Sequence, residues 1–199
     1  MPVLYTVIIR GFFVVAGLTI TLVSFAASTL PAEAPTVAPA APAADSTEAP
    51  VSASVLVAKA NESRITADMT PLAVNTKLEA AAQAKLADMV AKQYFGHRDA
   101  EGLGVWATIK ATSYQYRHAG ENLAKGWKSS DELQAAWMAS PTHCANIMDP
   151  RYTDIGIATA EVEIEGVKQN LTVELFGTTK QGSIGDSALS EAITRACGA

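Results

Sequence analysis

Three side chains in the sequence are of types that could do metal or acid–base chemistry. His97 occurs in YFGHRDAEG, Glu121 in HAGENLAKG and His143 in WMASPTHCANIM. Two imidazoles and a carboxylate suit a divalent transition metal such as zinc. In a hydrolase, Glu121 would act as general base while the histidines held the metal and its water. The spacing alone does not bring the three together, and lone histidines are more often ordinary surface or core residues.

Two residues close to these candidates are interpreted as structural. Ser140 precedes Pro141, a pairing typical of a helix N-cap followed by proline at the first helical position. The cap explains Ser140 without a nucleophilic role, and the G-x-S-x-G elbow is missing. It also predicts His143 in a first helical turn, where the helix dipole favours the neutral imidazole that binds metals or acts as a base. His118 has no comparable context and is expected to face solvent.

Four helices are predicted ahead of Pro150, in addition to the one that Ser140 caps. Their ranges are about 52–64, 76–94, 105–112 and from 129 or 130 onward, and the second has the clearest helical period of apolar residues. It opens with Thr76-Lys77-Leu78-Glu79, which predicts a capping box, and Ser129 or Ser130 with Glu132 predicts a second S-x-x-E opening. We therefore expect each candidate site residue just outside a helix or near its start.

Beyond Pro150 the apolar period changes to that of strands. A hairpin turn is predicted at Glu165-Gly166, and the strand positions are Ile155, Ile157, Val162, Ile164, Leu171, Val173 and Leu175. Helices followed by hairpin-connected strands predict an α+β fold with an antiparallel sheet. A short helix is expected over 186–197, within a C-terminal tail of residues 181–199.

The N-terminal part is expected to lie outside the folded domain. Residues 11–30 carry no charge and follow Arg10, which predicts either a cleaved signal peptide or an uncleaved membrane anchor within residues 1–30. Residues 31–51 are rich in proline and alanine and predict a disordered linker. The domain itself is expected over 52–180. Both readings place it outside the cytoplasm, extracellular or in the cell envelope, with the membrane as a partner if the anchor remains.

The composition excludes several classes of protein. The chain has 199 residues, 49% of them hydrophobic, a net charge of −5 and no cluster of lysines and arginines, so a nucleic-acid partner is not expected. Its two cysteines, Cys144 and Cys197, form no C-x-x-C motif, which excludes a zinc finger. In an exported protein a Cys144–Cys197 disulfide is expected, with buried free thiols as the alternative. The acceptor patterns at Asn61 and Asn170 are interpreted as chance glycosylation motifs.

Residues 55–177 resemble the CAP superfamily of cysteine-rich secretory proteins, antigen 5 and pathogenesis-related proteins, and are most similar to its bacterial SCP-like (YkwD-like) branch. The matching segments are NESR, LEAAAQAKLADMVAKQYFGH, AGENLAKG, WMASPTHCANIM, YTDIGIA and VELFG. The resemblance implies an α-β-α sandwich with the sheet between helical layers. It also implies a cleft that gathers His97, Glu121 and His143. Eukaryotic members carry a second cleft glutamate in the segment that corresponds to Trp137-Met138-Ala139-Ser140, where this chain has none.

The resemblance does not imply one activity. The expected function is a ligand-binding cleft that takes Zn²⁺ or another divalent cation, or a small molecule, a lipid or a cell-envelope component. One alternative is a metal-assisted hydrolase of envelope peptides or esters, and another is a protein-interaction domain with a vestigial cleft.

Overall fold

The computed structural model describes residues 50–179 and 186–198. The predicted apolar segment and most of the predicted linker lie outside these residues, and among the described helices none is long and apolar enough to cross a membrane. The elements in chain order are α1 (Ala53–Thr66), β1 (Ala73–Val74), α2 (Thr76–Ala91), α3 (Trp106–Ala111), β2 (His118–Lys125), α4 (Ser130–Ala139), α5 (Pro141–Ile147), β3 (Asp154–Ile164), β4 (Val167–Thr178) and α6 (Asp186–Cys197).

The described strands form one four-stranded sheet in the order β1-β3-β4-β2. β4 pairs antiparallel with both β3 and β2. The predicted hairpin turn is confirmed, because Glu165 and Gly166 join β3 to β4 with φ of 54° and 73°. The two-residue β1 runs parallel to β3, so the expectation of a wholly antiparallel sheet is wrong at that edge.

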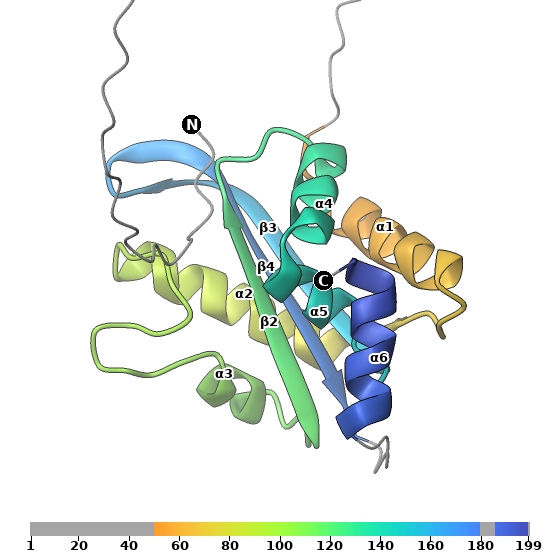
Figure 1. Ribbon diagram of the computed structural model, residues 1–199. Helices are drawn as coiled ribbons and strands as arrows, with labels where there is room; N and C mark the ends of the chain where they lie inside the picture. The colour runs from red at the N-terminus through yellow and green to blue at the C-terminus, as the bar shows by residue number, and fades with distance from the viewer. Residues whose placement is uncertain (1–49, 180–185, 199) are drawn as a thin grey trace, which may run out of the picture. The chain divides into compact units, whose positions relative to one another are not determined.

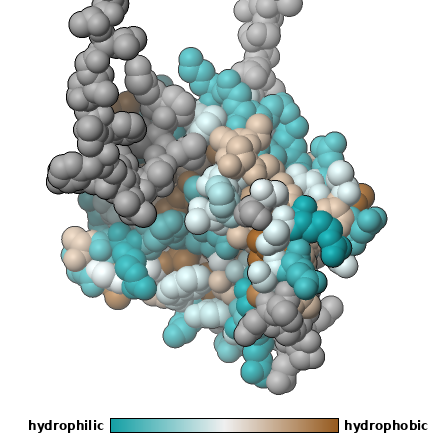
Figure 2. All heavy atoms as spheres, in the orientation of Figure 1, coloured by the Kyte–Doolittle hydropathy of each residue, from teal (hydrophilic) through white to brown (hydrophobic). Residues whose placement is uncertain are grey.

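Helices cover both faces of the sheet, as the predicted sandwich requires. Figure 1 shows α2 and α3 on one side and α1, α4, α5 and α6 on the other. Alternation along β4 divides the core between the faces: Val173 and Leu175 belong to the cluster with α2, while Phe176 packs with Trp137 of α4. The face seen in Figure 2 mixes hydrophilic and hydrophobic spheres, with no broad hydrophobic patch among the coloured residues.

The helices begin near the predicted positions, but the residue that caps a helix is not always the predicted one. At α4 the predicted cap is confirmed, since the Ser129 hydroxyl accepts from the Glu132 amide. At α2 the predicted capping box is wrong by one residue: Asn75 is the cap, and its side-chain oxygen accepts from the Lys77 amide. The bounds predicted for α6 are confirmed.

Two close contacts hold the layers together. Gly156 of β3 lies so near the first turn of α2 that a Cβ there would come within 2.3 Å of the Leu78 carbonyl carbon and the Glu79 nitrogen. On the other face, the buried guanidinium of Arg64 on α1 donates to four main-chain carbonyls, those of Thr70, Ile147, Asp149 and Tyr152. Sequence analysis did not identify either contact.

Candidate functional site

Glu121 lies on β2, a strand that the sequence analysis did not predict. The segment HAGENLAK lacks the β-branched residues of the other strands, and its glycine and asparagine are unfavourable in strands. Eight consecutive pairings with β4 hold it in the sheet. The expectation that Glu121 lies beside a helix is therefore wrong: it projects from a strand at the edge of the described sheet.

His97 comes from the loop after α2 and reaches Glu121 directly. Its Nδ1–H donates to Glu121 Oε1 across 2.6 Å, with 64% of the His97 side chain exposed but only 4% of that of Glu121. The loop is held by Asp99, whose carboxylate accepts from Lys92 Nζ at 2.6 Å and from the Leu103 amide at 2.8 Å. His97 is thus a largely exposed imidazole that is hydrogen-bonded to a buried carboxylate.

The second oxygen of that carboxylate has no partner. Glu121 Oε2 is buried and accepts no hydrogen bond in the described structure. An unpaired buried acceptor costs about 1–3 kcal/mol, more when the group is charged. Such an atom marks a place where a ligand, a water molecule or a cation would be stabilised.

His143 lies in the first turn of α5, as predicted. The prediction that Ser140 caps this helix is only partly correct. Ser140 is the N-cap residue and Pro141 follows it, yet the hydroxyl makes no cap hydrogen bond. Instead Ser140 Oγ lies 2.8 Å from Nδ1 of His143. This contact fixes the ring and leaves Nε2 as the nitrogen for a ligand.

The structure brings His143 into the electrostatic range of His97. Burial, and then the charge on His97, lower the pKa of His143 below its ordinary 6.5. Both effects favour the neutral form of the His143 imidazole. Of the three predicted site residues, His97 and Glu121 line one cavity, and His143 does not line it.

An amide network joins the strand to α5, and the sequence analysis missed its extent. Asn122 Nδ2 donates to the His143 carbonyl at 3.2 Å and to Glu174 Oε2 at 2.9 Å. Asn146 Nδ2 donates to the Glu121 carbonyl at 3.1 Å and to Asn122 Oδ1 at 2.9 Å. The two asparagines thus fix the backbones that carry Glu121 and His143. The sequence patterns described above did not single out Asn122, Asn146 or Glu174.

A cavity of about 340 Å³ opens beside the His97–Glu121 pair. Its lining residues are His97, Arg98, Val105, Trp106, Ala119, Gly120, Glu121 and Asn146. Gly120 must be small here, because a Cβ would approach the Tyr152 hydroxyl to 2.6 Å and Asn146 Oδ1 to 2.9 Å. Within the described residues, no three His, Cys, Asp or Glu side chains are arranged to hold a metal ion as they stand.

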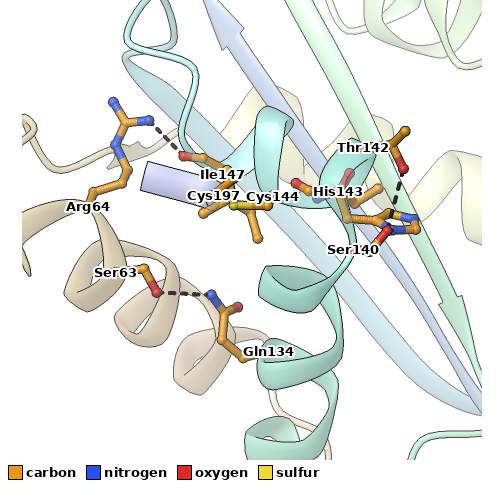
Figure 3. The surroundings of a disulfide bond; sticks show 10 residues. Ser63, Arg64, Gln134, Ser140, Thr142, His143, Cys144, Ile147 and Cys197 are labelled. Carbon is orange, nitrogen blue, oxygen red and sulfur yellow. Dashed lines mark hydrogen bonds between the residues drawn. A yellow bond between two sulfur atoms is a disulfide. The ribbon is translucent and has the colours of Figure 1, made fainter. Parts of the chain in front are cut away.

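The predicted disulfide is confirmed. Cys144 and Cys197 are bonded, with Cα atoms 5.9 Å apart, and the bond ties α6 to α5. Figure 3 shows it beside the turn that carries His143 and Ser140. The bond therefore joins the C-terminal helix to the residue next to His143.

The comparisons with known proteins agree with this architecture. The model of the cysteine-rich secretory protein (CAP) family matches residues 57–171. The chain belongs to this family. It is 36% identical over 119 residues to the uncharacterized protein YkwD of Bacillus subtilis, covering 58% of this chain and 46% of that relative. This CAP chain thus spans less than half the length of that relative.

Two solved structures share the CAP fold. An outer surface protein of Borrelia burgdorferi superposes with a TM-score of 0.57 at 20% identity, over 64% of this chain and 92% of that one. An extracellular protein containing an SCP domain, from Bacillus anthracis, gives 0.56 at 19% identity, over 64% and 40%. At such identities the likeness extends to the fold alone.

Proposed function

We propose that this chain is an exported CAP-domain protein whose cleft, formed by His97, Glu121 and His143, binds a divalent transition metal or a small ligand. One observation carries the proposal: the buried Glu121 carboxylate uses one oxygen to hold His97, and the other accepts no hydrogen bond from the described residues. Export is supported by the uncharged segment 11–30 and by the names of two structural neighbours, an outer surface protein and an extracellular protein. The same segment would act as a membrane anchor if it is retained.

The donor chemistry fits a metal, although the side chains are not arranged around one. Nε2 of His97, Nε2 of His143 and Oε2 of Glu121 are the donor atoms left free once the described hydrogen bonds are made. His97 is largely exposed and can turn, while Ser140 holds His143 in place. The two imidazoles and the carboxylate would then hold Zn²⁺, which would supply a Lewis acid.

Zinc titration calorimetry on the full chain tests the metal proposal. We expect one Zn²⁺ per chain, and His97→Ala, His143→Ala or Glu121→Gln should each weaken binding at least about tenfold, the minimum seen even for outer-shell partners of a metal. Glu161→Gln, at an exposed position on β3, is the matched control for Glu121→Gln. If zinc binding is absent, or is the same in all four variants, the metal proposal is wrong.

A hydrolase is the second candidate, and the His97–Glu121 hydrogen bond favours it. A carboxylate paired with an imidazole is a common means of taking a proton from water. Turnover of a peptide or ester that disappears in Glu121→Gln, while that variant keeps its circular dichroism spectrum, would support this candidate. A chain that neither binds zinc or a small ligand nor turns over a substrate would leave the interaction-domain alternative.

A further inference from the structure

A second cavity lies directly beside the first. It has a volume of about 330 Å³ and shares Trp106 and Ala119 with the cavity at Glu121. Its other lining residues are Tyr116, Arg117, His118, Arg151 and Tyr152. The two cavities therefore adjoin at Trp106 and Ala119.

Two aromatic rings form a wall of the second cavity. Trp106 is 36% exposed, although it is large and apolar. Its ring centroid lies 6.0 Å from that of Tyr116, with the ring planes tilted by 37°. Exposed aromatic faces of this kind pack against flat molecules, including the C–H face of a sugar ring.

The charge around this wall is positive, in a chain whose net charge is −5. Arg98 lines the first cavity, and its guanidinium donates to the Gly102 carbonyl at 2.8 Å. Arg117 lines the second, and within the described part of the chain no carboxylate pairs with either guanidinium. Arg151 differs, because Asp149 Oδ2 lies 2.6 Å from it. Among the described residues that line the second cavity, none is an aspartate or a glutamate.

The guanidinium and the aromatic pair of this cavity favour a ligand that carries a carboxylate and a flat ring face. A guanidinium presents a planar fork of N–H donors that matches a carboxylate, and the aromatic pair offers a stacking surface. The described residues that line this cavity offer no carboxylate to a metal ion, and a long acyl chain would have to pass the exposed guanidinium of Arg117.

We propose that the cavity formed by Trp106, Tyr116 and Arg117 binds a carboxylated sugar. The ring packs on Trp106 and Tyr116, and Arg117 pairs with the carboxylate. The remainder of the saccharide extends past Trp106 toward Arg98 and Glu121. Only this last step rests on the proposed function of the cleft.

Calorimetry with two matched sugars tests the inference. Methyl β-D-glucuronide and methyl β-D-glucoside differ only in the carboxylate, and the full chain should bind the glucuronide at least about tenfold more tightly, as expected for a hydrogen bond to a charged group. Arg117→Gln and Trp106→Ala should each weaken glucuronide binding by a similar factor. Arg117→Lys should also weaken it, because the charge remains but the fork is lost. Trp106→Phe should restore much of the binding that Trp106→Ala loses.

The controls separate this inference from the proposed metal site. Lys168→Gln removes an exposed charge on β4 and should not alter glucuronide binding. Arg117→Gln should bind zinc as the unmodified chain does, while His97→Ala should lose zinc but keep the glucuronide. Equal binding of glucoside and glucuronide, or binding of acetate as tight as that of the glucuronide, would overturn the inference. Glucuronide binding without zinc binding would uphold it and contradict the metal site.

Discussion

Glu121 Oε1 accepts a hydrogen bond from His97 Nδ1 across 2.6 Å, joining a buried carboxylate on β2 to an exposed imidazole in the loop after α2. Because the carboxylate is held on a strand and the imidazole on a loop, the histidine is the member that can move when a ligand enters.

The titration of His143 should report its distance from His97. Burial and the His97 charge both lower the pKa of His143, so NMR of the metal-free chain should place it below 6.5. In His97→Gln the charge is gone and only burial remains, so the pKa should rise toward 6.5. A His143 pKa that is the same with and without His97 would show that the two rings do not interact.

The buried carboxyl of Glu174 should make stability fall as pH rises. Burial raises its pKa from 4.5 to about 8, so between these values the folded chain keeps a proton that the unfolded chain has lost. The contribution of Glu174 to the free energy of unfolding should be largest below pH 4.5. Between pH 4.5 and about pH 8 it should decrease by up to about 1.4 kcal/mol per pH unit. Urea unfolding measured from pH 4.5 to 8.5 shows the slope.

Glu174→Gln should flatten that slope, because the amide resembles the protonated acid and can still accept from Asn122. The variant should therefore be more stable than the unmodified chain at pH 8. Glu161→Gln, at an exposed site, should leave the slope as it is. A slope that persists in Glu174→Gln would assign it to another group.

Gly156→Ala should separate α2 from the sheet. The added Cβ would lie 2.3 Å from main-chain atoms of Leu78 and Glu79, which cannot rotate away. We expect a loss of about 3 kcal/mol or more, at or above the usual upper range for overpacking, measured by urea unfolding. Gly96→Ala is the matched control, since its nearest contact would be an ordinary 3.5 Å. Equal stability of the two variants would contradict this packing.

Arg64→Lys should destabilise the chain although it preserves the charge. Burial lowers the pKa of Arg64 to about 10, so the guanidinium is charged at pH 7 and donates to four carbonyls. An ammonium cannot reach all four, and the expected loss is about 2–4 kcal/mol in urea unfolding. The exposed Arg195→Lys should change stability by less than about 0.5 kcal/mol. If Arg64→Lys also changed stability by less than about 0.5 kcal/mol, the guanidinium of Arg64 would not be required for stability.

Reduction of the Cys144–Cys197 bond should destabilise the domain and release α6 first. The bond spans 53 positions, for which the loss of chain entropy in the unfolded state corresponds to about 4 kcal/mol. Hydrogen exchange should accelerate over Asp186–Cys197 on reduction, with β4 amides still protected. The Cys197→Ala variant should be insensitive to reductant. Unchanged exchange in α6 would mean that packing alone holds this helix.

The sequence by itself determined the elements with strong periodicity. The apolar spacing along α2, the alternation on β3 and β4 and the Glu165-Gly166 turn are local properties, because they depend on neighbouring residues in the chain. The candidate residues His97, Glu121 and His143 were also found from the sequence, through residue types and the motifs that resemble the CAP family. These features can be identified without a fold.

Only the tertiary structure decided how those residues meet. β2 has weak strand propensity and exists through its pairing with β4, so Glu121 could not be placed on a strand from its neighbours. The same holds for the Ser140 hydroxyl, which bonds to His143 rather than to the backbone, and for the network of Asn122, Asn146 and Glu174. These contacts join segments that lie far apart in the chain or compete with local caps, and their geometry is fixed only when sheet and helices pack.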